Sequence, residues 1–128
     1  MTNDNLKNTP EHQAMATAAL DVLDTNFFKA LCEPIRVEII RKLITIGACD
    51  VGTIAKGLAP DRSVISRHLA TLEQAGITAS RKIGRRVLYD LNGPYIRDKV
   101  ADIMKVAEPM AKLCVPFATH DNQKEGAA

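Results

Sequence analysis

The chain has 128 residues and a formal net charge of +2, with 46% hydrophobic and 25% charged residues. This length suits about one domain, and the balance of residue types is ordinary for a globular core. Three Phe, two Tyr and no Trp are too few for an aromatic platform that stacks single-stranded nucleic acid.

The two ends of the chain are polar. No run of about 18 apolar residues occurs, and the opening MTNDNLKNTP does not resemble a signal peptide. We therefore expect a cytoplasmic protein with no membrane partner. We also expect disordered tails at residues 1–10 and 119–128, with one folded domain over residues 11–118.

The first two predicted helices follow from apolar spacing and from proline. The first begins near Glu11, and its apolar stripe has spacings of 4, 3 and 4 residues: Ala16, Leu20, Leu23 and Phe27, extended by Leu31. Pro34 interrupts this stripe because proline favours a helix start. The second helix, roughly Pro34 to Ile46, is apolar on two rows, so we expect a central buried helix that ends at Gly47.

Two shorter helices are predicted next. Asp50 is suited to N-cap the first of them, and Asp61 is suited to N-cap a helix within SVISRHLATLEQAGI, residues 63–77. At helical spacing, Ser63 and Arg67 point away from a buried stripe formed by Ile65, Leu69 and Leu72. Two short helices joined by a tight turn, the second with a polar outer face, predict a helix-turn-helix.

The period changes after Gly76. Val87, Tyr89 and Leu91 alternate in ITASRKIGRRVLYDL, with Gly84 at the turn, which predicts a two-stranded hairpin with a basic tip. Such a hairpin directly after a helix-turn-helix is the wing of a winged helix. Residues 61–86 hold six cations and two acids, so this segment is suited to meet a polyanion.

The last predicted helix begins near Gly93-Pro94 and carries a heptad-like seam: Ile96, Val100, Ile103, Ala107, Met110 and Cys114. A compact winged-helix core cannot easily cover so long a stripe, so we expect a homodimer through this helix, helped by the first helix. The residues expected in the dimer interface are Leu20, Ile96, Val100, Ile103, Ala107 and Met110.

Three stretches together resemble the ArsR/SmtB-type family of bacterial winged-helix repressors: FKALCEPIRVEIIRKL, SVISRHLATLEQAGI and SRKIGRRVLYDL. The resemblance covers roughly Phe27 to Leu91. It implies a mostly α fold with a small β-hairpin, a winged helix-turn-helix. It also implies a homodimer that binds an imperfect palindrome in operator DNA and leaves it when an inducer arrives.

Two groups of residues are expected to contact double-stranded DNA. The first lies on the recognition helix, where Arg suits guanine and Ser suits a base edge or a phosphate: Arg62, Ser63, Ser66, Arg67 and His68. For His68 a structural role and a phosphate contact both remain open. The second lies on the wing and is expected to bind phosphates or the minor groove: Lys82, Arg85 and Arg86.

The cysteines are the candidate sensor residues. Cys32, Cys49 and Cys114 are too few and too scattered for a disulfide scaffold. Asp50-Val51-Gly52 stands where the family has a Cys-Val-Cys metal site. The family's other metal site places histidines on the last helix, but no histidine occurs between His68 and His120. The resemblance therefore implies neither of these two zinc-type sites here.

The family includes regulators that sense arsenic(III) with thiolates and others that close a disulfide or polysulfide bridge. The resemblance therefore implies a thiol switch at Cys32 and Cys114, with Cys49 as a spectator or third ligand. No cofactor is certain, and arsenic(III) or another thiophilic metal is a candidate.

Other functions stay open at this point. The cysteines are small apolar packing residues if the repressor is constitutive or answers to another signal. A winged helix used for protein contacts has no need of arginines on both the recognition helix and the wing. No motif supports an enzyme, because the sequence lacks a Gly-rich phosphate loop and an evident acid pair.

Overall fold

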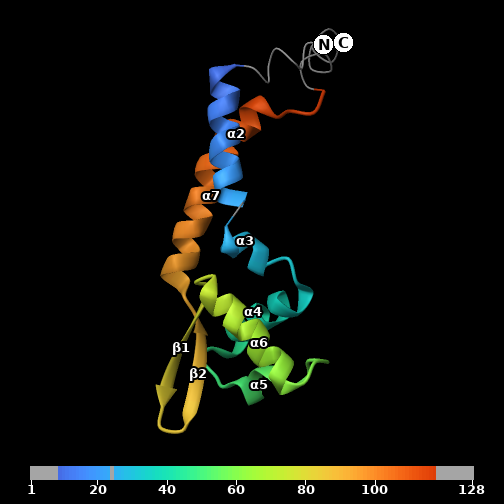
Figure 1. The fold of residues 1–128 in the computed structure, drawn as a ribbon, viewed down its shortest axis with the longest axis vertical. Coiled ribbons are helices and arrows are strands. Elements are labelled where there is room, and N and C mark those ends of the chain that lie inside the picture. The colour runs from blue at the N-terminus through green and yellow to red at the C-terminus, as the bar shows by residue number, and fades with distance from the viewer. Residues whose placement is uncertain (1–8, 24, 118–128) are drawn as a thin grey trace. The chain divides into compact units, whose positions relative to one another are not determined.

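The computed structural model describes residues 9–23 and 25–117, and the expected tails lie almost wholly outside these ranges. Helices and a single hairpin follow one another along the chain (Figure 1): α2 (Pro10–Leu23), α3 (Asn26–Ala30), α4 (Pro34–Ile46), α5 (Val51–Ala55), α6 (Arg62–Gln74), β1 (Thr78–Ile83), β2 (Arg86–Leu91) and α7 (Gly93–Leu113). They form two compact units. One contains α2 and the part of α7 from Val100 onward, and the other runs from Thr25 to Lys99. Within the described residues, no helix is long and apolar enough to cross a membrane.

The unit with α2 and the later part of α7 has a small apolar core. Met15 and Ala19 are buried with Val106, and three partly buried side chains pack against them: Val22, Met110 and Leu113. The predicted stripe of the first helix is not the face buried within the chain, since Leu20 is 67% exposed. Met15, Ala19 and Val22 form an equally regular stripe, and this is the one that α7 covers.

The first helix is also shorter than predicted. It ends at Leu23, and the separate helix α3 starts at Asn26, so Phe27 and Leu31 do not prolong its stripe. Phe27 is buried in the other unit instead. The break removes the expected continuity between the first helix and the segment before Pro34.

The second unit, residues 25–99, contains the helix-turn-helix and the hairpin, and we call it the winged unit. Its core follows the predicted apolar rows more closely. Its fully buried large side chains come from α4, α5, α6 and the residue before β1: Ile39, Leu43, Ile54, Ile65, Leu69, Leu72 and Ile77. Pro34 opens α4, and Gly47 ends it with a positive φ of 87°. These two boundaries are confirmed.

Among the described residues, the helix α4 is covered on one face. The helices α5 and α6 and strand β2 pack against α4. Val37 and Ile44 on the second apolar row are exposed, Ile44 to 68%. The expectation of a helix buried on both rows is wrong for this reason.

The helix-turn-helix pair begins with the predicted caps. An Asp50 carboxylate oxygen accepts a hydrogen bond from the Thr53 amide at 2.9 Å, and an Asp61 oxygen accepts one from the Val64 amide at 3.1 Å. Each bond satisfies an amide that the first helical turn leaves without an intrahelical partner. The caps fix where α5 and α6 begin, and α6 carries Ile65, Leu69 and Leu72 inward as predicted.

The hairpin is confirmed, with Gly84 at its turn. Its antiparallel strands pair Ile83 with Arg86 at the tip and Thr78 with Leu91 at the base. Gly84 has a φ of 62°, a backbone conformation that glycine adopts without the steric cost of a Cβ. An isolated antiparallel bridge between Cys49 and Tyr89, which was not predicted, adds a further pairing beside the hairpin. This bridge joins the start of α5 to the edge of the wing.

The last helix spans Gly93–Leu113 and contains Pro109. The buried residue on α7 is Val106, which the predicted seam did not include. Of the residues expected in the dimer interface, Leu20 and Val100 are exposed, and four others are half-buried: Ile96, Ile103, Ala107 and Met110. Met110 packs against the core that α7 shares with α2, so its side chain is already partly used within the chain.

Candidate nucleic-acid interface

The outer face of α6 has the character that its sequence predicts. Ser63 and Arg67 are exposed, while Ile65, Leu69 and Leu72 on the opposite face are wholly buried. Arg62 is exposed at the first position of the helix, and Ser66 is half-buried. The N-terminal half of α6 therefore presents hydroxyls and two guanidinium groups on a rigid element anchored by its apolar face.

The α6 cap also organises this face. The Ser63 hydroxyl donates to an Asp61 carboxylate oxygen at 2.7 Å, and the Val64 amide donates to the same oxygen. These two bonds, the Ser63 bond first, lower the pKa of Asp61. The carboxylate stays ionised at neutral pH and holds the Ser63 hydroxyl at the start of the helix.

Arg62 lies against the preceding helix α5. A Cβ built on Gly52 would lie 3.4 Å from the Arg62 Nη2 atom, so the missing side chain makes room for the guanidinium. Gly52 occupies the position of the second cysteine of the family's Cys-Val-Cys metal site. In this chain the guanidinium of Arg62 lies against that glycine.

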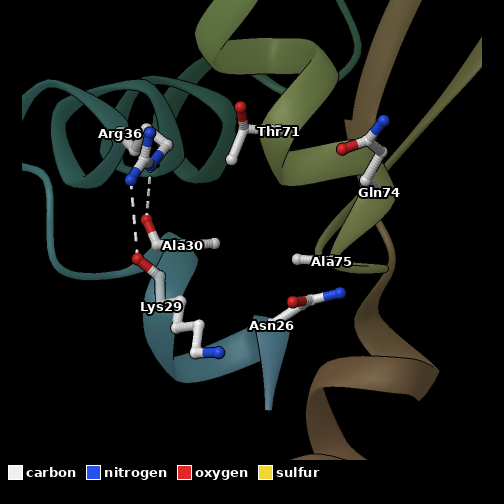
Figure 2. A pocket seen from close by; sticks show the side chains of 7 residues that line it. All are labelled: Asn26, Lys29, Ala30, Arg36, Thr71, Gln74 and Ala75. Atoms are coloured by element: carbon white, nitrogen blue, oxygen red, sulfur yellow. Dashed lines mark hydrogen bonds between the residues drawn. The ribbon is translucent and has the colours of Figure 1, made fainter. Parts of the chain in front are cut away.

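His68 faces the interior of the winged unit rather than its outer surface. Its Nδ1 atom lies 3.4 Å from Nη1 of Arg36, and the contact is partly buried. Arg36 also donates from Nε to the Ala30 carbonyl at 2.6 Å and from Nη2 to the Lys29 carbonyl at 3.4 Å (Figure 2). The guanidinium thus joins the end of α3 to α4 and α6, which favours the structural role for His68.

Arg36 was not predicted from the sequence as a residue of this site. It lies in the first turn of α4, six residues after Ala30, the last residue of α3. The last carbonyl groups of a helix lack intrahelical partners, so a cation shortly after a helix end is suited to bind them. This pattern could have indicated Arg36 from the sequence. Its contact with His68 joins residues 32 positions apart, and no local sequence pattern predicts that contact.

A small hollow lies beside this contact. Its volume is about 170 Å³, and its lining comes from α3, from Arg36 and from Thr71, Gln74 and the adjoining Ala75 (Figure 2). These α6 residues belong to the second half of the helix, whereas Ser63 and Arg67 belong to the first half. The hollow is therefore separate from the face that carries the candidate base contacts.

The wing carries the remaining predicted cations. Lys82 and Arg85 are exposed near and at the turn of the hairpin. Arg86 is exposed too, but its Nη2 lies 3.2 Å from an Asp50 carboxylate oxygen. The three wing cations are therefore not equivalent, because one of them has an anionic partner within the chain.

The three cysteine thiols are free and differ in environment. Cys49 is buried, and burial first, then the charges of Asp50 and Asp90, raise the pKa of its thiol. Cys32 and Cys114 are exposed and belong to different units. The Cys32 thiol donates to the Phe28 carbonyl at 3.3 Å, and Cys114 follows the last residue of α7. In residues 9–23 and 25–117, no three His, Cys, Asp or Glu side chains are grouped so as to hold a metal ion.

Comparison with known proteins agrees with this geometry. The family model described as "Bacterial regulatory protein, arsR family" matches residues 33–79. The Arsenical resistance operon repressor of Escherichia coli is 34% identical over 86 residues, which cover 67% of this chain and 73% of the relative.

Two solved structures extend the likeness. A homodimeric winged helix-turn-helix DNA-binding domain from Mycobacterium bovis is 27% identical with a TM-score of 0.55, covering 72% of this chain and 83% of that one. An ArsR-like transcriptional regulator from Rhodococcus has a TM-score of 0.66, covering 86% and 96% of the two chains. At 22% identity it shares the fold alone.

Proposed function

The chain belongs to the ArsR family of bacterial DNA-binding regulators, and is therefore no enzyme. On this premise we propose that it is a transcriptional repressor that binds a palindromic operator as a homodimer. We further propose that a thiol-directed signal at its cysteines releases it. The observation that carries the proposal is the outer face of α6, where Ser63 and Arg67 are exposed opposite a wholly buried stripe.

The proposed contacts divide between base recognition and backbone binding. Arginine binds guanine in bidentate fashion, and hydroxyls bind base edges or phosphates, so α6 is assigned to the major groove. Cations on the hairpin bind phosphates and supply affinity that depends on salt. The proposed contact residues are Arg62, Ser63, Ser66 and Arg67 of α6 and Lys82, Arg85 and Arg86 of the wing, while His68 keeps the structural role that its contact with Arg36 favours.

The proposed dimer uses the first and last helices. Leu20 of α2 and Val100 of α7 are exposed apolar side chains, and the M. bovis relative is homodimeric. The other proposed interface residues are Ile96, Ile103, Ala107 and Met110. A two-fold dimer places two α6 helices in successive major grooves, which matches the symmetry of a palindrome.

Operator binding is tested by fluorescence anisotropy with a palindromic duplex from upstream of the protein's own gene. An unrelated duplex of equal length serves as the comparison. We expect the operator to bind about 1,000-fold more tightly or better. Sedimentation should give two chains per duplex. Equal affinity for both duplexes, unaffected by salt, would contradict the proposal.

The proposed signal acts at the two exposed thiols. Cys49 is unsuited to react first, because it is buried and the raised pKa of its thiol disfavours the reactive thiolate. Peroxide would take two electrons and two protons from Cys32 and Cys114 to form a disulfide and two waters. Arsenite would instead exchange two hydroxide ligands for the two cysteine sulfurs, and each thiol proton would leave with a hydroxide as water, without oxidation.

We expect peroxide, a persulfide donor or arsenite to weaken operator binding at least about 10-fold, within the usual range for coupling between two sites. Cys32→Ser and Cys114→Ser should each abolish this response and leave binding by the reduced protein unchanged. Cys49→Ser is the matched control and should keep the response. Binding that ignores every reagent and every substitution would instead identify a constitutive or otherwise regulated repressor with structural cysteines.

A further inference from the structure

Asp50 joins the start of α5 to the wing through three hydrogen bonds. Its Oδ1 accepts from the Thr53 amide at 2.9 Å and from the Thr53 hydroxyl at 2.7 Å, while its Oδ2 accepts from Arg86 Nη2 at 3.2 Å. The bonds from Thr53, followed by Arg86, lower the pKa of Asp50 to about 2. The side chain is therefore an anion at neutral pH, next to a cation of the proposed DNA-binding surface.

The backbone keeps Asp50 beside the wing. The Cys49 amide donates to the Tyr89 carbonyl at 3.1 Å, and the Tyr89 amide donates to the Cys49 carbonyl at 2.8 Å. Asp50 cannot leave β2 without breaking these bonds. The Arg86 side chain is 64% exposed, so its guanidinium can turn toward solvent while Asp50 stays in place.

The Arg86–Asp50 pair is suited to exchange partners. An ion pair this exposed stabilises a protein only weakly, whereas an arginine on a DNA phosphate makes charge-assisted bonds and releases counterions. When Arg86 leaves, Asp50 keeps both bonds from Thr53. The exchange therefore leaves no carboxylate without a hydrogen-bond partner.

We propose that Asp50 restrains DNA binding by competing with backbone phosphates for Arg86, which exchanges Asp50 for a phosphate when a duplex binds. The inference rests on the proposed function and names a regulator of the wing that the contact residues alone do not include. Because every duplex offers phosphates, Asp50 sets affinity and leaves sequence preference unchanged.

The test compares Asp50→Asn, Arg86→Gln and the double variant by fluorescence anisotropy on the operator and the unrelated duplex. Asparagine caps a helix about as well as aspartate, so α5 should persist, and thermal unfolding checks this. We expect Asp50→Asn to tighten binding to both duplexes about two- to five-fold, the range that an exposed ion pair supports. In the Arg86→Gln background this gain should vanish.

Asp61→Asn is the matched control. Asp61 caps α6 as Asp50 caps α5, but its carboxylate accepts hydrogen bonds from Ser63 and Val64, and the arginine whose charge acts on it is Arg67 of α6, not Arg86. Any gain from removing its charge should therefore be the same with and without Arg86→Gln. This separates competition for Arg86 from general repulsion between a carboxylate and DNA.

Two results would overturn the inference while leaving the proposed function intact. One is a gain from Asp50→Asn that persists in the Arg86→Gln background, and the other is weaker binding by Asp50→Asn, which would mean that Arg86 works only when Asp50 holds it. A wild-type chain that binds neither duplex overturns the proposed function and this inference together.

Discussion

Replacing Arg67 by alanine should weaken operator binding about 10- to 100-fold, the loss expected for one bidentate contact to a base. Arg67 is exposed on α6, and the helix is anchored by Leu69 and Leu72 on its opposite face. The substitution removes no buried surface, so the free energy of unfolding should hardly change. Anisotropy titrations on the operator and on an unrelated duplex measure the effect.

Arg67→Lys separates base recognition from charge. Lysine keeps the positive charge but lacks the planar fork that binds guanine in bidentate fashion. Binding of the unrelated duplex should therefore stay near the wild-type value, while the preference for the operator falls. Arg97→Ala on α7 is the control, because Arg97 is an exposed arginine already paired with Asp98. Equal losses on both duplexes for Arg67→Lys would show that Arg67 binds phosphate rather than a base.

The features predicted correctly from the sequence are those that local chemistry determines. Asp50 and Asp61 begin helices because their carboxylates satisfy amides three residues ahead, and this pattern is visible without a fold. Gly84 marks the hairpin turn for an equally local reason, its positive φ. The candidate DNA-binding face of α6 follows from the same kind of evidence, since its buried stripe defines the opposite face.

The features that were missed depend on contacts between distant segments. The Arg36–His68 contact spans 32 positions and the Arg86–Asp50 bond spans 36. Neither changes the period of the sequence around it. Each contact was missed because the residues around an arginine in a regular pattern do not indicate which distant residue its guanidinium will contact. Both contacts alter the candidate site, since one turns His68 inward and the other gives a wing cation an internal partner.

The stripe of the first helix shows a different limit. Ala16, Leu20 and Leu23 have the same spacing as Met15, Ala19 and Val22, and periodicity alone does not choose between them. The choice is made by α7, where Val106 faces the second set. The first set still has a role in the proposed homodimer, because the exposed Leu20 side chain is part of the surface that a second chain would cover.

Replacing Gly76 by alanine should reduce the free energy of unfolding by about 2–5 kcal/mol. Gly76 links α6 to β1 with a φ of 82°, and a Cβ there would lie 2.5 Å from Cε2 of Tyr95. The left-handed backbone costs a residue with a Cβ roughly 1–2 kcal/mol, and overpacking adds roughly 1–3 kcal/mol. Urea unfolding of the full chain at one fixed concentration measures the loss.

Two controls divide this cost into its parts. Gly84→Ala also replaces a glycine of positive φ, 62°, but a Cβ there would meet nothing within 4 Å, so it should show the conformational cost alone. In a Tyr95→Ala background the Gly76→Ala loss should shrink toward the Gly84→Ala value, because the clashing ring is gone. If Gly76→Ala already costs no more than Gly84→Ala in the wild-type background, the Tyr95 ring moves aside freely. The junction between the recognition helix and the wing would then require glycine for its backbone alone.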